Sequence, residues 1–274
     1  MTPTAPGASP TSGAVARPWV QVRTTPFGSA LRRWRLTRGL SQLELSVAAE
    51  TTSRHLSFLE TGRSRPSRDM VGRLAEALGL PLRERNGLFL SAGLAAVYPE
   101  SALDGEDLAS FRVVVDRMLE RQEPYPAYAV DGHWNIVRMN AAAARFLAGS
   151  DERNVVRLTY AGVWRDLIDN WDDVAWPAIR RLQAEAARYP QDMELAALVD
   201  LAVEAAGPAP REPADASPRV LCPRFRIGDD VVRTISVVAQ FGAPVDVTLD
   251  ELRIELIHPA DEDAERFFTQ GQTR

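Results

Sequence analysis

The sequence predicts an α+β protein made of two unlike parts, and two observations lead to this prediction. Between residues 26 and 95, helix-capping residues and glycines bracket short runs with apolar residues at helical spacing. From residue 127 onward, two β-prone runs, a long helical stretch and three further β-prone runs follow one another. A chain of 274 residues is long enough for two domains. We therefore expect a five-helix bundle over 26–95, followed over 96–274 by a domain with a five-stranded antiparallel sheet and helices.

Each of the five predicted helices has a recognisable start and a narrow apolar stripe. The first stripe is Phe27, Leu31 and Trp34, at the i, i+4 and i+7 spacing of one helix face. The second helix begins with Ser41 and Glu44, which have the spacing of a capping box. Residues expected to begin the other three helices are Thr52, Ser67 and Pro81. These short amphipathic helices predict a small bundle with a single core.

The second and third predicted helices, 42–49 and 53–61, are joined by only a few residues, as in a helix-turn-helix. In the later helix only Leu56 and Leu59 are spaced to face a core, and most of the remaining side chains are hydrogen-bond donors or acceptors. The second helix of such a pair lies in the DNA major groove while its back rests on the bundle. This explains a helix with so few apolar residues, and it predicts DNA binding by the segment 26–95.

Charge is divided unevenly along the chain, which has Arg but no Lys. Residues 1–98 hold 13 Arg and 6 acidic residues, a net +7, while residues 99–274 hold 19 Arg and 31 acidic residues, a net −12. Together these give the overall −5. A basic first third is typical of a module that binds a polyanion, and the acidic remainder is unsuited to phosphate.

Other features exclude some classes of protein. Cys222 is the only cysteine, so no intrachain disulfide and no thiolate metal cluster can form. The tail over 1–25, rich in Pro, Thr, Ser, Ala and Gly, lacks the apolar run of a signal peptide and is expected to be disordered. The sequence contains no span of ~20 apolar residues, so no membrane helix is predicted. We expect a cytoplasmic protein with no membrane partner.

The stretch "LSQLELSVAAETTSRHLSFLETGRSRPS" resembles the xenobiotic-response-element type of helix-turn-helix, which is familiar from phage repressors. That family's pattern is a Leu-Ser-Gln start, an apolar-spaced helix, a capping Thr or Ser, and then an aliphatic residue, Glu and Gly. The positions of this chain that match are Gln42, Thr52, Leu56, Leu59, Glu60 and Gly62. The resemblance spans residues 27–92 and implies double-stranded DNA as the partner, with a protein-only helical module as the alternative.

The same resemblance implies roles for individual side chains. Gln42 would bond a phosphate, Ser53, Arg54 and Ser57 would face the bases, and Arg63 and Arg65 would contact the DNA backbone. Arg54 is the expected specific reader, since a guanidinium pairs with both acceptors of a guanine. Phe58 would touch a thymine methyl or pack on sugar. The DNA-binding set also includes Thr52 and His55, the latter with a structural role as its alternative, and a solvated role is the alternative for each arginine.

The remainder of the chain predicts strands on both sides of a helical stretch. Runs 127–130 and 134–139 flank Asp131-Gly132, a strong hairpin signal. The pattern from 154 to 206 is helical, and Trp164, Leu167 and Trp171 are spaced as one stripe. A Pro-rich loop over 207–218 then precedes three strands, which are 220–227, 231–240 and 252–258. This layout is similar to that of PAS-like sensor domains.

The whole chain, over about 26–268, resembles regulators of the MmyB-like type, which join the same helix-turn-helix to a ligand-binding domain. The stretches that carry the resemblance are "RHLSFLETGRSRPSRDM", "LPLRERN", "EPYPAYAVDGHWNIVRMN", "NWDDVA" and "DELRIELIHPADED". The family implies transcriptional control by a small molecule, often an apolar one.

Such a molecule needs a space lined by apolar rings and a few polar groups. The strand 252–258 places Leu252, Ile254, Leu256 and His258 on one face, which we expect to face the helices. The predicted ligand-binding residues are Trp134, Asn140, Trp164, Asn170, Trp171, Phe225, Arg226 and His258. The alternatives are that the rings fill the space completely and that the polar residues are caps or surface groups.

No catalytic, cofactor or metal site is predicted. The sequence contains no nucleophile elbow, no glycine-rich phosphate loop and no His, Asp and Glu group with metal spacing. We expect a transcription regulator that binds DNA as a homodimer. Two alternatives remain: a constitutive DNA-binding protein whose second domain only dimerises, and an enzyme fused to a DNA-binding module.

Overall fold

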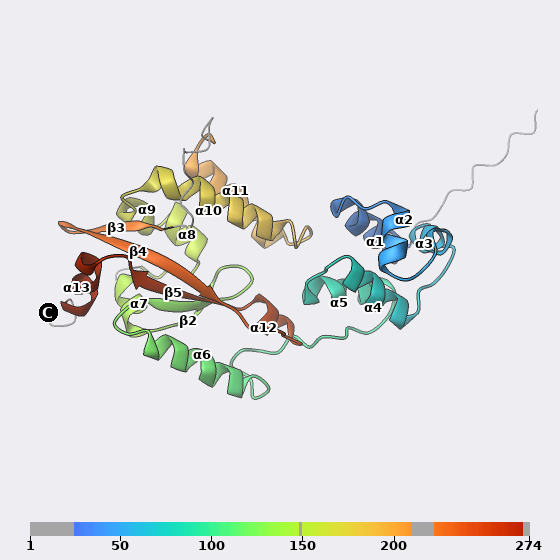
Figure 1. Cartoon of the computed structure of the whole chain (residues 1–274), viewed down its shortest axis with the longest axis horizontal. Coiled ribbons are helices and arrows are strands. Elements are labelled where there is room, and N and C mark those ends of the chain that lie inside the picture. The colour runs from blue at the N-terminus through green and yellow to red at the C-terminus, as the bar shows by residue number, and fades with distance from the viewer. Residues whose placement is uncertain (1–24, 148–149, 210–221, 271–274) are drawn as a thin grey trace, which may run out of the picture.

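A computed structural model describes residues 25–147, 150–209 and 222–270. The expected disordered tail lies almost wholly outside these ranges, as does most of the predicted loop 207–218. Figure 1 shows a bundle of helices α1–α5 beside a larger domain, which consists of a sheet with helices on both of its faces. The α+β class and the order of its two parts are confirmed.

The bundle contains the five predicted helices: α1 (Pro26–Thr37), α2 (Gln42–Ala48), α3 (Ser53–Glu60), α4 (Arg68–Ala77) and α5 (Leu82–Ser91). The capping box is formed, because Ser41 Oγ accepts from the Glu44 amide at 3.1 Å and a Glu44 carboxylate oxygen accepts from the Ser41 amide at 2.7 Å. Thr52 and Ser67 also accept from backbone amides at the starts of α3 and α4. Local capping therefore sets the helix boundaries that the sequence predicts.

The bundle core holds one buried ion pair at the junction of α1 and α3. Arg35 is 8% exposed and Glu60 is 3% exposed. The guanidinium donates from Nε and Nη2 to the two Glu60 carboxylate oxygens, at 2.6 and 3.1 Å. Gln42 adds a third donor at 2.8 Å, so three helices meet at one carboxylate. The bond to Glu60 raises the pKa of Arg35, which keeps its charge.

Helices α1 and α3 also approach each other closely at Gly28. A Cβ atom at this position would lie 2.4 Å from the Glu60 carbonyl oxygen and 2.7 Å from that of Leu59. Only a residue without a side chain fits there. The recognition-type helix is thus held by backbone contact at its end as well as by the ion pair.

The second domain is built on a five-stranded antiparallel sheet in the order β2-β1-β5-β4-β3. Its strands are β1 (Ala127–Val130), β2 (Ile136–Met139), β3 (Arg224–Ile227), β4 (Asp230–Ala239) and β5 (Arg253–Pro259). Its helices are α6 (Ala109–Arg121), α7 (Ala141–Phe146), α8 (Val155–Tyr160), α9 (Trp164–Leu167), α10 (Trp171–Ala186), α11 (Met193–Ala206), α12 (Val247–Glu251) and α13 (Glu262–Gln270). The predicted five-stranded antiparallel sheet is confirmed.

The two faces of the sheet have different covers, as Figure 1 shows for α6 below the sheet and α8–α11 above it. Against α6, Val115 and Leu119 pack on Leu252 and Ile254. Our expectation for this strand is wrong: the face carrying Ile254 and Leu256 meets α6, a helix that was not among the predicted elements. The opposite face of β5, with Glu255 and Ile257, meets the space under α8–α10. The alternation of side chains along a strand shows which residues share a face, but it does not show which helix covers each face.

The expected stripe of Trp164, Leu167 and Trp171 is also wrong. Trp164 begins the four-residue helix α9, and Trp171 begins α10 after the chain becomes extended at Ile168. Ile168 forms a β-bridge with Phe225 there. Two short elements thus replace one helix, and this break brings Trp164 toward the sheet while leaving Trp171 at the outer edge.

Candidate DNA interface and ligand cavity

Helix α3 has the form required of a recognition helix. Leu56 and Leu59 are fully buried against the bundle, whereas Arg54 is exposed. Thr52 precedes the helix and accepts from the His55 amide at 3.1 Å. The first turn of α3 is therefore fixed by its cap, with its polar side chains directed away from the core.

Two arginines flank one aromatic ring on this surface. The guanidinium carbon of Arg54 lies 5.4 Å from the centre of the Phe58 ring, and that of Arg63 lies 5.9 Å from it. Both distances are within the range of a cation–π contact. Phe58 therefore supports the exposed charges of Arg54, at the start of the helix, and of Arg63, beyond its end.

Two predicted DNA contacts also hold the helix pair together. The Gln42 amide donates to Glu60, and the hydroxyls of Ser53 and Ser46 are hydrogen-bonded at 3.0 Å. His55 and Ser57 are half-buried, and Arg63 and Arg65 are exposed beyond the helix. DNA contact by each of these residues stays a prediction.

A cavity of about 350 Å³ lies between the sheet and helices α7–α10. That volume falls within the range of small-molecule pockets. Its wall is mostly apolar, and its members include Ala143, Phe146, Leu147, Val156, Trp164, Val174, Ala178, Phe225 and Ile257. The side chains of the two layers therefore do not fill the space between them.

Four polar side chains occupy one part of the cavity wall. Tyr128 on β1 and Glu255 on β5 are paired in register, so their side chains lie on the same sheet face. Glu255 accepts from Arg181 Nη2 at 3.1 Å and from the Ser236 hydroxyl. Burial raises the pKa of Tyr128, so that its hydroxyl stays protonated. These four groups make a neutral polar patch in a mostly apolar wall.

Three of the eight predicted ligand residues line this cavity: Trp134, Trp164 and Phe225. The Trp134 ring contacts two guanidiniums, with its centre 5.0 Å from that of Arg181 and 5.3 Å from that of Arg253. Its indole nitrogen donates to Glu185 at 3.0 Å. Whether these rings contact a ligand stays a prediction.

The other five predicted residues lie elsewhere, and placing them in the cavity wall was wrong. Asn140 is a buried helix cap, with its side-chain oxygen bonded to the Ala127 amide at 3.0 Å. Asn170 bonds the Cys222 and Arg224 backbones in a separate hollow.

The remaining three also lie outside the cavity wall: Trp171 and His258 are half-buried, and Arg226 is exposed. Trp171 packs on Tyr160 and on the Arg165 guanidinium. Arg226 is exposed and pairs with Asp169. His258 lies beside Gln122 at the end of β5.

Sequence reasoning missed the polar patch. Glu255 sits between apolar residues in β5, a pattern that suggests a solvent-facing position. A signal was nevertheless present, because Glu255 and Arg253 share the face opposite Leu252 and Ile254, and the structure places this strand at the centre of the sheet. Charged residues facing inward from a central strand need partners, and Arg181 and Glu185 provide them.

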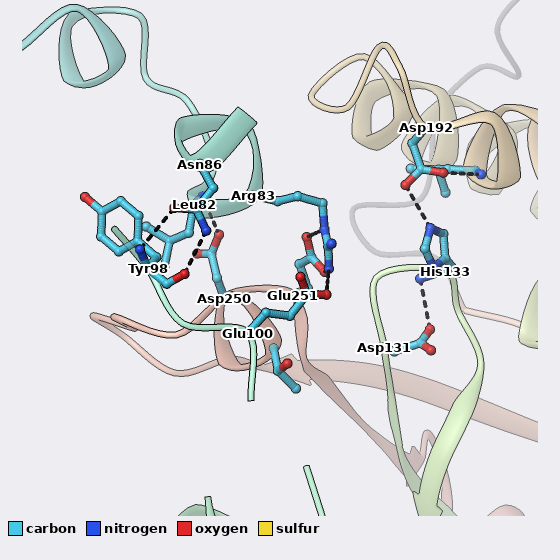
Figure 2. A network of polar contacts seen from close by, with 12 residues as sticks. Leu82, Arg83, Asn86, Tyr98, Glu100, Asp131, His133, Asp192, Asp250 and Glu251 are labelled. Atoms are coloured by element: carbon cyan, nitrogen blue, oxygen red, sulfur yellow. Dashed lines mark hydrogen bonds and ion pairs between the residues drawn. The ribbon is translucent and has the colours of Figure 1, made fainter. Parts of the chain in front are cut away.

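Polar contacts join the bundle to the sheet domain, as Figure 2 shows. Arg83 of α5 donates to both carboxylate oxygens of Glu251 in α12, at 2.8 and 2.9 Å, and to Glu100 at 2.7 Å. Beside it, the Leu82 amide donates to Asp250 at 3.1 Å. Helix α12 leads directly into β5, whose Glu255 lines the cavity. The bundle is therefore attached to the strand that carries the polar patch.

Two further features of this region appear in Figure 2. Asn86 on α5 holds the following segment, because its side chain bonds the backbones of Val97 and Tyr98 at 2.7 to 3.0 Å. In the sheet domain, His133 in the β1–β2 hairpin bonds Asp192 at 2.8 Å. The hairpin is thereby tied to the start of α11.

The fold and these surfaces define a helix-turn-helix transcription regulator with a ligand-binding type of domain. Residues 26–88 match the helix-turn-helix domain model, and residues 111–270 match the model of the MmyB-like transcription regulator ligand binding domain. The chain belongs to the MmyB-like transcription regulator family. Both resemblances noted in the sequence are confirmed. None of the helices in the described ranges is both long and apolar enough to span a bilayer.

Two solved structures are similar to part of the chain. The restriction-modification controller protein C.AhdI from Aeromonas hydrophila is 31% identical, with 22% of this chain and 92% of that chain covered and a TM-score of 0.22. The clp gene regulator ClgR from C. glutamicum is 29% identical, with 25% of this chain and 84% of that chain covered and a TM-score of 0.22. No curated protein matches the chain.

Proposed function

We propose that this regulator binds its operator through α3 and takes a mostly apolar small molecule into the cavity of its second domain as an effector. The observation that carries the proposal is the cavity itself, which is apolar, of ligand size and located in a domain of a ligand-binding family. DNA as the partner implies action in the cytoplasm. A constitutive regulator would have no use for such a space.

Filling the cavity is the direct test. Ala178 on α10 lines it, and Ala178→Leu adds apolar volume there without removing a contact. We expect at least roughly tenfold weaker binding of any molecule that co-purifies with the protein or shifts its melting temperature, since overlap with the new side chain must be relieved. Mass spectrometry of the denatured protein and titration calorimetry would measure this loss.

Ala184→Leu is the matched control, because it makes the same change at an exposed position of the same helix. Binding should survive there. If the wild-type protein binds no apolar molecule and Ala178→Leu regulates as the wild type does, the second domain serves only for assembly or dimerisation.

A route from the cavity to the DNA-binding helices runs through β5, α12 and α5. Glu255 lies in the cavity wall, Glu251 lies four residues earlier on α12, and Arg83 on α5 holds Glu251. A ligand shifts the position of the bundle only if it binds one arrangement of the domains more tightly than another. The Arg83–Glu251 pair is the contact through which such a difference would be transmitted.

Breaking this pair should uncouple the two sites. In Arg83→Ala, the effector should still bind the cavity within about twofold, but the change it causes in operator affinity, typically 5–150-fold for coupled sites, should largely disappear. Gel-shift titrations with and without effector would measure this. Arg73→Ala, which removes a half-buried arginine whose ion pair within the described residues is with Asp69, should leave the response intact. An unchanged response in Arg83→Ala would show that the coupling runs elsewhere.

We further propose a homodimer on DNA. One recognition helix reads only a few base pairs, and two-fold pairing doubles the contacts. The acidic second domain, unsuited to phosphate, is the expected dimerisation surface. Footprinting should show two half-sites about one helical turn apart, or a multiple of it. Protection of a single half-site at saturating protein would contradict the dimer.

A further inference from the structure

The polar part of the cavity contains a hydroxyl with no partner among the described residues. Tyr128 is 8% exposed and lines the cavity, yet its hydroxyl makes no hydrogen bond to any residue in the ranges that the structure describes. Tyr160 offers the contrast: it also lines the cavity, but its hydroxyl donates to the Ala175 carbonyl at 2.7 Å. The Tyr128 hydroxyl is therefore available to a bound molecule.

Glu255 has acceptor capacity to spare beside it. A carboxylate offers about four acceptor positions, and Ser236 and Arg181 occupy one each. The carboxylate and Tyr128 come from paired positions of neighbouring strands and face the same cavity. One free donor-acceptor and one free acceptor thus face the same cavity from paired positions of neighbouring strands.

The charge of this patch is already balanced. Arg181 is paired with Glu255, which is buried. A ligand carboxylate would meet the like charge of Glu255, and taking Arg181 for itself would leave Glu255 buried and unpaired. A ligand ammonium would meet Arg181 in the same way. An uncharged polar group brings neither cost.

We propose that the effector is an uncharged amphiphile whose polar end is a hydroxyl, donating to Glu255 and accepting from Tyr128. A hydroxyl is the simplest uncharged group that both donates and accepts, which a ketone or ester carbonyl does not. The apolar body of the molecule lies along Leu147, Trp164 and Phe225. This inference rests on the proposed ligand-binding function and specifies the chemical class of the ligand.

Three probes with the same chain test the class: 1-decanol, decanoate and decylamine, each titrated into the full-length protein at pH 7.5. Tryptophan fluorescence is a suitable signal, because Trp134 and Trp164 line the cavity, and calorimetry supplies the affinities. We expect decanol to bind at least tenfold more tightly than either charged probe. This comparison uses only the wild-type protein, so the result does not depend on whether any variant folds.

Two variants assign the preference to named groups. Tyr128→Phe should weaken decanol severalfold, whereas Tyr160→Phe, which removes a hydroxyl already paired with backbone, should leave the preference for decanol unchanged. Glu255→Gln removes the repelling charge and should shift the ratio of decanol to decanoate affinity at least tenfold toward decanoate.

The outcomes separate this inference from the proposed function. Tighter binding of decanoate or decylamine than of decanol by the wild type would overturn the hydroxyl assignment, while an apolar-ligand function would stand. Equal effects of Tyr128→Phe and Tyr160→Phe would also overturn it. Absence of binding by all three probes would overturn both the assignment and the ligand-binding function.

Discussion

Replacing Arg35 by Met is expected to destabilise the helical bundle by about 3–5 kcal/mol, the typical loss when one partner of a buried ion pair is removed. The variant leaves the Glu60 carboxylate in the core with Gln42 as its one remaining side-chain donor among the described residues. Because whole domains are stable by only about 5–15 kcal/mol, much of the bundle's stability would be lost. Operator binding should fall as the folded fraction falls.

Amide hydrogen exchange is the suitable measurement, because it reports opening of α1 and α3 separately from the sheet domain. Arg73→Met, at a half-buried position on α4 whose ion-pair partner Asp69 is exposed, is the control and should cost ~0.5 kcal/mol or less. The double variant Arg35→Met/Glu60→Leu should recover most of the loss, since neither charge then remains buried. A loss below about 1 kcal/mol in the single variant would contradict this account of the core.

Arg54→Ala should weaken operator binding by ~1–3 kcal/mol and relax the base preference at one position. Arg54 is exposed at the start of α3, and the Phe58 ring supports its guanidinium. A guanidinium in the major groove pairs with two guanine acceptors at once, so alanine loses a bidentate contact. Binding measured against a set of operators with single base changes would show both the loss and the relaxed position.

Arg63→Ala is the natural comparison, because Arg63 contacts the same ring from beyond the helix end. Its loss should weaken binding to all DNA sequences by the same factor. It should also reduce the slope of log affinity against log salt concentration by the amount expected for about one phosphate contact. The two arginines thus give distinguishable signatures. Unchanged affinity and unchanged specificity in Arg54→Ala would show that α3 is not placed in the groove as proposed.

The bundle was predictable because its signals are local. Ser41, Thr52 and Ser67 cap helices within three residues of themselves, and the stripe of Phe27, Leu31 and Trp34 needs only one helix to be recognised. The Arg35–Glu60 pair was not predicted, since its partners are 25 residues apart and nothing in the spacing joins them. Contacts of that kind depend on how the helices pack.

The cavity was predictable in location but not in its polar groups. Aromatic residues in a sheet-and-helix domain indicated Trp134, Trp164 and Phe225, whereas the polar members depend on which face of β5 points inward. That choice is made by α6, whose buried Val115 and Leu119 cover Ile254 and its neighbours. The i, i+4 spacing of these two residues was visible in the sequence. Because α6 was not predicted, the sequence did not show which face of β5 packs on helices α8–α10.

The side chain of Asn86 has a consequence for separating the two parts of this protein. Because Asn86 bonds the backbones of Val97 and Tyr98, the start of the connecting segment belongs structurally to the bundle. A fragment ended at residue 95 would leave that half-buried amide without its partners. The modular unit that could be transplanted onto another sensor domain therefore extends at least through Tyr98, and a working chimera also needs an acidic residue on the new sensor to receive Arg83.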